Sequence, residues 1–525
     1  MIRQVEGMFW LKIRSMRRVC AIGTVLALFG GVSVLTGCAV GPDYRRPAPP
    51  DVKSYTAHTL PARTAAAAGP GGSAQSFVVG RKVEGAWWSL FRSPELDRLI
   101  SVALAHNPSL VAAQNTLLAA QDQVRVGEGA FFPSLSGSVN AARELQPFQS
   151  AGLTTTTGKV TGSTSNSPFS LLNAGVSVSY APDVFGGVRR QVEGLEAAAQ
   201  EQRFALEAAY LALTANVVTA AVTDASLRAQ IVATKGIVAA ERNELQILQR
   251  QVTLGGAAES SVMTQQALLA QTLATLPPLE NQLAQTRNQL AAYEGAYPAD
   301  FHDPDFNLAQ LHLPHRLPVS LPSELVRQRP DIREAAAVLH QDTAAVGVAT
   351  ANMLPQITLS GSVGHEALTA ASLFTPETLL WNLAAGVVQP LFEGGSLFYQ
   401  RRAAIATMRA AAATYQDTVI LAFQNVSDVL VSLTNDARAL QADRAAETAT
   451  RESLDVAEAQ YRAGAVPYTT VLTAEQSYEK SVIIRIQATA QRYADTAALF
   501  QALGGGWWQR RDVAPNIEKC CGVLP

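Results

Sequence analysis

The chain has 525 residues, of which 48% are hydrophobic and 16% are charged, and its formal net charge is -2. This near-neutral charge argues against a nucleic-acid-binding protein. Beyond the N-terminus no apolar run approaches about 18 residues, so we do not expect the mature chain to cross a membrane as helices. Any membrane-crossing part would have to consist of strands in a closed sheet, because lipid offers no partners for backbone polar groups.

Residues 1–37 have the layout of a secretory signal peptide. Basic residues precede an apolar run at 19–35, which leads into Leu-Thr-Gly-Cys. This ending resembles a bacterial lipobox, which implies cleavage before Cys38 and acylation of its sulfur, with sorting to the outer membrane. The alternative is a signal anchor that ends in a chance cysteine. The Pro-, Ala- and Gly-rich segment 38–86 is expected to be an extended, lipid-anchored tether.

The remaining chain consists of two similar halves. Gly255 and Gly464 lie 209 residues apart in similar short motifs, and so do Gly295 and Gly504. A repeat of this length is far longer than a solenoid unit, so each copy must be a whole structural half. The expected parts are a first repeat, a linker, a second repeat and a C-terminal tail, at 87–300, 301–320, 321–506 and 507–525.

Each repeat contains two segments in which apolar and small polar residues alternate. These expected strands lie at about 133–145 and 173–182, and again at about 355–364 and 381–391. Alternation with a period of two is typical of a half-exposed strand, and also of a membrane strand between lipid and water. Four strands cannot close a barrel, so several chains would have to share one, and three chains would supply twelve strands.

A very long helix and a returning helix follow each strand pair. No proline occurs between Gly187 and Gly255, and neither proline nor glycine occurs between Gly395 and Gly464. At 1.5 Å per residue such helices would span roughly 100 Å. We expect tunnel helices at about 188–294, kinked at Pro277 and Pro278, and at about 396–503. Their thin apolar stripes predict packing around water rather than around a conventional core.

Several distinctive short motifs are distributed along nearly the whole mature chain. They include Asp183-Val184-Phe185-Gly186, Arg329-Pro330-Asp331-Ile332, Gln389-Pro390-Leu391-Phe392 and Tyr461-Arg462-Ala463-Gly464. Through these motifs the chain resembles the TolC/OprM-type outer-membrane efflux factors, in their NodT-like lipoprotein branch. The resemblance implies a mostly α-helical fold with a membrane β-barrel part, in which each repeat gives a β-hairpin and a long helical hairpin.

The same resemblance implies an assembly and a function. The assembly would be a homotrimer with a 12-stranded β-barrel on a periplasmic α-helical barrel, in contact with outer-membrane lipid. Its partners would be a periplasmic adaptor (membrane fusion protein) and an inner-membrane pump, expected to be of the RND type although the sequence does not distinguish pump classes. The function would be that of an outer-membrane channel subunit of a tripartite efflux system, a passive exit duct for small molecules that contributes to multidrug resistance.

By resemblance, the turns at Gly255 and Gly464 form the periplasmic entrance of the duct. Family members often carry aspartates six and nine residues after the second glycine, where this chain has Thr470 and Thr473. The position six residues after the first glycine is Ser261. A ring of carboxylates would attract cations and repel itself, and hydroxyls would not. We therefore expect a less cation-selective and less acid-sensitive closed gate.

Two alternatives for the turns stay open. Glu259 could replace the missing carboxylates, or the hydroxyl groups could serve as caps of the returning helices. The other expected residues of the gate are Ser260, Tyr468 and Thr469. Candidate gate bonds are those of Arg250, Tyr461 and Arg462.

The sequence carries no enzyme signature. His312 and His315 form an H-x-x-H in a Pro-rich linker without helical register, which is a poor metal site. The glycine-rich stretches lack a phosphate-loop pattern. We expect no catalysis, no cofactor, no metal and no nucleic acid. The competing hypothesis is a lipid-anchored periplasmic coiled-coil scaffold or adaptor without a pore, and the duplicated strand pairs argue against it.

Overall fold

The computed structural model describes residues 39–145, 155–156, 159–160, 168–302 and 304–509. The predicted signal peptide, Cys38 and the tail with Cys520 and Cys521 lie outside these residues. The chain divides into two compact units, each assembled from separate segments. The first unit takes Met1–Arg45, Gln121–Ala197 and His340–Ala410, and the second takes Arg46–Ala120, Ala198–Leu339 and Ala411–Pro525. Each unit therefore draws on both repeats, so the compact units do not follow the repeat boundaries.

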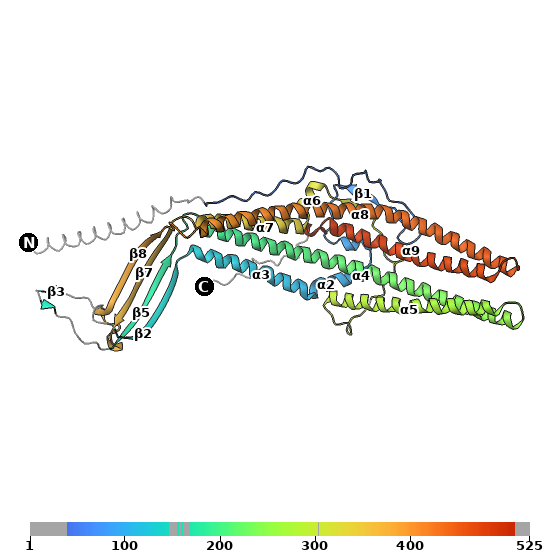
Figure 1. Cartoon of the computed structure of the whole chain (residues 1–525), viewed down its shortest axis with the longest axis horizontal. Coiled ribbons are helices and arrows are strands. Elements are labelled where there is room, and N and C mark those ends of the chain that lie inside the picture. The colour runs from blue at the N-terminus through green and yellow to red at the C-terminus, as the bar shows by residue number, and fades with distance from the viewer. Residues whose placement is uncertain (1–38, 146–154, 157–158, 161–167, 303, 510–525) are drawn as a thin grey trace, which may run out of the picture. The chain divides into compact units, whose positions relative to one another are not determined.

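Helices make up most of the described chain (Figure 1). In order, the α-helices are α2 (Pro94–His106), α3 (Pro108–Glu128), α4 (Gly187–Thr253), α5 (Glu259–Glu294), α6 (Pro322–Gln328), α7 (Pro330–Ala351), α8 (Ser396–Arg462) and α9 (Tyr468–Ala502). Short 3-10 helices include η1 (Trp87–Phe91), η2 (Gly129–Phe131), η4 (Ala370–Ser372), η5 (Pro376–Thr378) and η6 (Trp507–Gln509).

The strands are short apart from four. They are β1 (Ser76–Val79), β2 (Ser134–Glu144), β3 (Thr155–Thr156), β4 (Lys159–Val160), β5 (Phe169–Tyr180), β6 (Arg316–Val319), β7 (Gln356–Ala367) and β8 (Leu379–Val388). Relative to the strands expected from alternation, β5 begins four residues earlier and β8 ends three residues earlier. The two-residue strands β3 and β4 lie in the chain segment that connects β2 to β5, and they pair with each other in a separate sheet.

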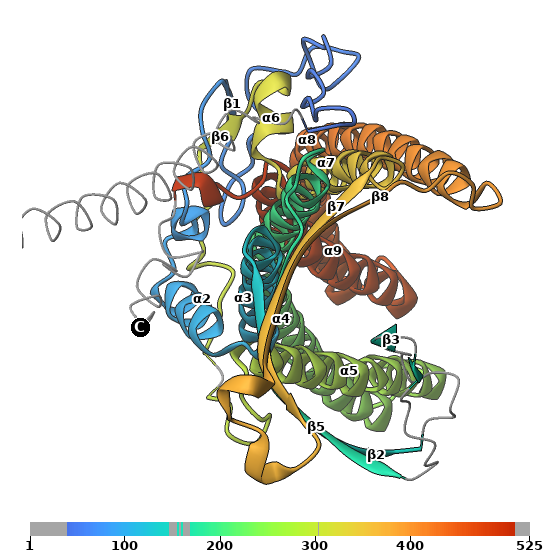
Figure 2. The same ribbon diagram turned by 90° about the vertical axis from the view of Figure 1, so that its left-hand side faces the viewer.

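The first unit is built around one antiparallel sheet with the order β2-β5-β7-β8 (Figure 2). The first repeat contributes β2 and β5, and the second contributes β7 and β8. The pairing of β5 with β7 joins the two repeats, with Val176 opposite Val363 and Ser177 opposite Ser362. The duplicated hairpins thus form one continuous sheet.

The long helices have the lengths expected from the spacing of glycines. Helices α4 and α8 have 67 residues each, which corresponds to roughly 100 Å at 1.5 Å per residue. The returning helices α5 and α9 have 36 and 35 residues. Pro277 and Pro278 lie within α5, which continues past both of them without a break.

The second unit contains a large hydrophobic core, and the expectation that the long helices bury little is wrong here. Trp87, Phe91 and Phe500 have no exposed surface, and Tyr493 is 1% exposed. The Trp87 and Phe500 rings stack with centroids 5.2 Å apart. The core arises because η1, α2 and the segment before β6 cover the apolar stripes of α4, α8 and α9. Of these covering segments, η1 and the segment before β6 are too short to be recognised by periodicity.

The expected tether and linker meet in a small sheet that the sequence did not predict. Strand β1 pairs in parallel with β6, with Phe77 opposite Leu317. Buried Arg492 of α9 holds the chain before β1, donating hydrogen bonds to the carbonyl oxygens of Gly71 at 2.6 Å and Ser73 at 3.2 Å. The segment is therefore fixed to the helices by backbone and side-chain bonds.

Helix α4 contradicts the expectation that no apolar stretch beyond the N-terminus is long enough to span a membrane. It contains one stretch that is long and apolar enough to cross a membrane, judged by length and composition alone. Most of that stretch is buried inside the protein, as in the core helix of a soluble domain, so it is weak evidence for a span. The sequence search missed it because small polar residues interrupt the apolar run.

Candidate functional site

The four-stranded sheet has one apolar face that extends over all its strands. Pairing aligns the members of this face in rows across the sheet. Two such rows are Leu135-Val178-Gly361-Leu383 and Gly137-Val176-Val363-Trp381. Several of these side chains are left largely uncovered by the described part of the chain: Leu135 is 72% exposed and Leu383 is 80% exposed. An uncovered apolar face of this extent requires an apolar environment.

The opposite face of the sheet carries mainly small polar residues. One row runs Ser136-Ser177-Ser362-Asn382 and another begins with Asn140 opposite Asn173. The hydroxyl oxygens of Ser136 and Ser177 lie 2.8 Å apart, within hydrogen-bond distance. Because side chains alternate along a strand, the register places every serine of the row on the face away from the apolar row. The sheet separates an apolar side from a polar side.

Both edges of this sheet are open within the described part of the chain. Strands β2 and β8 stand at the ends of the order, and each pairs with one strand only. Their side chains are exposed along nearly their whole length. Unpaired backbone groups at an edge favour addition of further strands, and in lipid they are costly.

The residues that follow the predicted lipidation site are anchored in the first unit. Val40 donates its backbone N–H to the carbonyl of Phe185 at 3.1 Å. The buried Arg190 guanidinium of α4 donates to the Val40 carbonyl at 3.1 Å and to Asp43 at 2.6 Å. Arg190 also pairs with Glu193 at 2.7 Å. The chain next to Cys38 is thereby held at the junction between β5 and α4.

The turns at the ends of the two helical hairpins have the same backbone geometry. Gly255 and Gly464 have φ of 73° and 74°. In the first turn the Gly256 N–H donates to the Gln251 carbonyl at 2.7 Å, and in the second the Ala465 N–H donates to the Gln460 carbonyl at 2.9 Å. This is the Schellman arrangement, and its left-handed residue is why both turns contain glycine.

The predicted hydroxyl residues lie around these turns but do not cap the returning helices. The N-cap residues are Ala258 and Pro467, and neither provides a side-chain cap. The capping hypothesis is therefore wrong. Glu259 is the first residue of α5 and is exposed, as are Ser260, Thr469, Thr470 and Thr473, whereas Ser261 is half-buried. Thr473 donates to the Thr469 carbonyl within its own helix.

Two tyrosines connect the helical hairpins to each other near the turns. The Tyr461 hydroxyl donates to Gln251 Oε1 at 2.9 Å, which joins α8 to α4. The buried Tyr468 hydroxyl donates to Gln265 Oε1 at 2.7 Å, which joins α9 to α5. The two rings meet edge to face with centroids 5.5 Å apart. Tyr461, which the sequence suggested as a candidate for a gate bond, thus joins the two hairpins within one chain.

The predicted arginines do not make bonds between hairpins in this chain. Arg462 pairs with Glu458 of its own helix at 2.6 Å, and its side chain is 73% exposed. Arg250 is exposed and has no ion pair with any residue that the structure describes. Neither arginine joins one hairpin to the other.

A group of glutamates lies farther along the hairpins, and the sequence reasoning missed it. Glu241 has no exposed surface. It accepts a hydrogen bond from Thr272 at 2.7 Å, while its second carboxylate oxygen has no partner among the described residues. Glu244 and Glu475 are half-buried nearby, as is Glu479 one turn along α9. We call Glu241, Glu244, Glu475 and Glu479 the glutamate cluster.

The environment of this cluster favours protonated carboxyl groups. Burial, followed by the charges of Glu241, Glu244 and Glu458, raises the pKa of Glu475 to about 7. Burial and the charges of Glu241 and Glu475 raise the pKa of Glu479 to about 8. Burial also raises the pKa of Glu241 and of Glu244. The sequence did not indicate this cluster, because its members on α4 and α9 are separated by more than 200 residues along the chain.

The described residues contain no group of three metal-ligating side chains placed to hold a metal ion. The two regions that stand out for function are therefore the amphipathic sheet and the helix turns.

The comparisons with known proteins agree with this geometry. The model of the outer membrane efflux protein family matches residues 99–296 and 321–505. OprJ, an outer membrane protein of Pseudomonas aeruginosa, is 28% identical over 485 residues, covering 91% of this chain and 95% of OprJ. OpmQ of Pseudomonas putida, a pyoverdine export outer membrane protein, is 27% identical over 80% of this chain and 88% of its own length. SilC of Salmonella typhimurium, a probable outer membrane lipoprotein, is 25% identical over 91% of this chain and 97% of its own length.

Solved structures show the same fold. The outer-membrane channel OprN superposes with a TM-score of 0.76 at 26% identity, over 90% of this chain and all of that one. The open state of the Neisseria gonorrhoeae MtrE outer membrane channel superposes with a TM-score of 0.75 at 24% identity, over 90% of this chain and 99% of that one. The matched segments cover both repeats, with their strands and helical hairpins. The chain belongs to the outer membrane efflux protein family, and it is an outer-membrane channel component of an efflux system.

Proposed function

We propose that three copies of this chain form a closed 12-stranded β-barrel in the outer membrane, continued by a periplasmic α-helical barrel. The observation that carries this proposal is the amphipathic sheet with two open edges. Edge strands of one copy would pair with those of the next, which removes the unpaired backbone groups from lipid. Because each chain supplies four strands, three copies supply the twelve strands of the barrel.

In this assembly the apolar rows would face lipid and the serine rows would face the water-filled interior. An outward apolar band and a polar lumen are the arrangement of outer-membrane barrels. The duct would be passive and would act without chemistry of its own. Cys38, if acylated, would add a lipid anchor close to the β5–α4 junction, where Val40 and Asp43 are held.

The helix turns would form the periplasmic entrance and would dock a periplasmic adaptor, which connects the duct to an inner-membrane pump of the RND type. Exposed apolar side chains at the turns, such as Leu254 (85%) and Met263 (60%), offer contact surface. The names of the relatives refer to different exported substances: pyoverdine export for OpmQ, toluene efflux for TtgC and cation efflux for CusC. We therefore assign selection of the exported small molecule to the pump.

For the gate, the turn itself would be weakly cation-selective, because Ser261, Thr470 and Thr473 replace carboxylates. Acid sensitivity would come instead from the glutamate cluster farther along the hairpins. Planar-bilayer recordings test the selectivity. Weak cation selectivity is expected, whereas strong cation selectivity with block by divalent ions at the entrance would contradict this part of the proposal.

The alternative is a lipid-anchored periplasmic coiled-coil scaffold without a pore. Purification of wild type and Cys38→Ala distinguishes the two. A channel remains detergent-requiring after loss of the lipid anchor and gives discrete single-channel conductance steps in planar bilayers. A Cys38→Ala variant that is monomeric and soluble without detergent, with no conductance, would establish the scaffold.

A further inference from the structure

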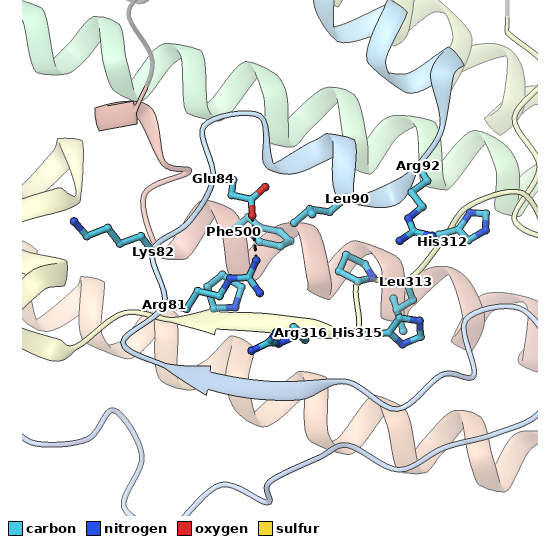
Figure 3. Close-up of a pocket in the computed structure, with 12 residues that line it drawn as sticks. Arg81, Lys82, Glu84, Leu90, Arg92, His312, Leu313, His315, Arg316 and Phe500 are labelled. Atoms are coloured by element: carbon cyan, nitrogen blue, oxygen red, sulfur yellow. Dashed lines mark hydrogen bonds and ion pairs between the residues drawn. The ribbon is translucent and has the colours of Figure 1, made fainter.

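A basic pocket lies in the second unit, and its lining includes no residue of the four-stranded sheet or of the helix turns. It encloses about 280 Å³. Its walls come from the loop after β1, from the residue after η1, and from β6 with the segment before it (Figure 3). The charged and titratable side chains around it are Arg81, Lys82, Arg92, Arg316, His312, His315 and Glu84. Four cations thus surround the pocket, against one carboxylate.

The floor of the pocket is rigid and apolar. Phe500 forms part of it, has no exposed surface and stacks on Trp87 with ring centroids 5.2 Å apart. The wall at His312 is fixed by its backbone N–H, which donates to the Phe91 carbonyl at 3.0 Å. Because the wall and floor are anchored in the core, the pocket is preformed rather than a gap between mobile side chains.

Most of the positive charge around the pocket is left without a partner. Arg81 pairs with Glu84 at 3.1 Å. Lys82, Arg92 and Arg316 have no side-chain hydrogen bond or ion pair with any residue in the described part of the chain, and all three are exposed. Figure 3 shows Arg92 and His312 side by side at one end of the pocket. Arginine forks match carboxylate and phosphate oxygens, so this arrangement suits an anion.

Arg92 has a backbone conformation that a side chain of its kind rarely adopts. Its φ is 52° and its ψ is 40°, and it is the single non-glycine residue with positive φ among those described. Glycine would occupy this left-handed position without steric cost. Strained residues of this kind concentrate at functional sites. An arginine at this position is explained if its guanidinium has a ligand.

We propose that this pocket binds a small anion with two phosphate or carboxylate groups, held chiefly by Arg92 and Arg316 above the Phe500 floor. The volume admits a compact ligand, and the open side allows such a group to belong either to a free anion or to a lipid headgroup. The shared chemistry is a pair of anionic oxygen groups.

Calorimetric titration of the purified full-length protein in non-ionic detergent at low ionic strength tests the proposal. The probes are pyrophosphate and tricarballylate. We expect saturable binding of at least one probe, and a loss of affinity of tenfold or more in Arg92→Gly and in Arg316→Gln. Arg327→Gln, which removes an exposed arginine of α6 in the same unit, is the matched control and should bind like wild type.

Thermal unfolding separates this role from a structural one. Arg92→Gly relieves the left-handed backbone, so its melting temperature should equal or exceed that of wild type while its affinity falls. Competition for the pyrophosphate site by a short-chain cardiolipin, which carries two phosphate groups, would identify a lipid headgroup as the source, and absence of competition would identify a free anion. The proposal is overturned if neither probe binds wild type, or if Arg92→Gly and Arg316→Gln bind as wild type does.

Discussion

The four-stranded sheet and the helical core of the second unit obtain their stability in different ways. The core contains large side chains such as Trp87 and Phe500 with no exposed surface. In the sheet, apolar side chains such as Leu383 are 80% exposed, and both edges are open. The helical unit therefore carries its own hydrophobic core, while in the proposed assembly the sheet would depend on lipid and on further copies of the chain.

Trp87→Ala should destabilise the helical unit whatever surrounds the sheet. Removing a fully buried aromatic side chain costs about 3–5 kcal/mol, because transfer free energy is lost and a cavity remains. Chemical unfolding followed by circular dichroism at the helix band should show the same loss in detergent and in lipid vesicles. A loss that changes strongly with the lipid would mean that this core is not self-sufficient.

Leu383→Arg should act only where the sheet meets lipid. A charge on the lipid-facing side of a membrane strand costs about 2–4 kcal/mol at the bilayer midplane. We expect reduced folding into vesicles, measured by the shift of the folded band in unheated electrophoresis. Asn382→Arg places the same charge on the neighbouring residue of the opposite face and is the matched control. Equal effects of the two variants would contradict the assignment of the two faces.

Tyr468→Phe should loosen the helix turns by a smaller amount. It leaves the buried Gln265 Oε1 without the hydroxyl that donates to it at 2.7 Å, at a cost of about 1–3 kcal/mol. Faster hydrogen exchange should be confined to α5 and α9 near the turns, with the core of the second unit unchanged. Thr469→Val, a substitution at the exposed neighbouring residue, serves as the control. An equal effect of that variant would contradict the claim that the Tyr468 hydroxyl stabilises the turns.

The glutamate cluster should make the hairpins more stable in acid. Burial raises the pKa of Glu475 to about 7 and of Glu479 to about 8, above the value of about 4.3 in an unfolded chain. The stabilising contribution is therefore full below about pH 4.3 and is lost as the pH rises through 7 and 8. Hydrogen-exchange protection of α9 near Glu475, corrected for intrinsic rates, should be greater at pH 5.5 than at pH 8.5.

Glu479→Gln checks the origin of that pH dependence. A neutral amide cannot ionise, so the difference in protection between the two pH values should become smaller. Glu452→Gln, at an exposed position of α8, should leave the difference unchanged. Greater protection at the higher pH in the wild type would show that these carboxylates do not act as described.

Much of the sheet and of the long helices follows from local sequence patterns. Strict alternation predicts both ends of β2 to within one residue and both ends of β7 to within three residues, because a period of two is a strong signal. The turns at Gly255 and Gly464 follow from the need for a left-handed residue. These features depend on neighbours along the chain, which a sequence displays directly.

The features that the sequence missed depend on contacts between distant residues. Strand β6 has four residues, one of them Pro318, and pairs with β1 more than 200 residues away. The glutamate cluster joins Glu241 of α4 with Glu475 of α9, and each alone looks like a solvated helix residue. The large core was missed because short segments such as η1 cover helix stripes that look thin in isolation.

In the proposed assembly, the open-edged sheet closes with two further copies of the chain. Native mass spectrometry of the protein released from detergent micelles measures this most directly, because it counts chains without reference to shape. We expect a species of three chains that persists until the protein is unfolded by heat. A monomer as the dominant folded species under the same conditions would contradict it.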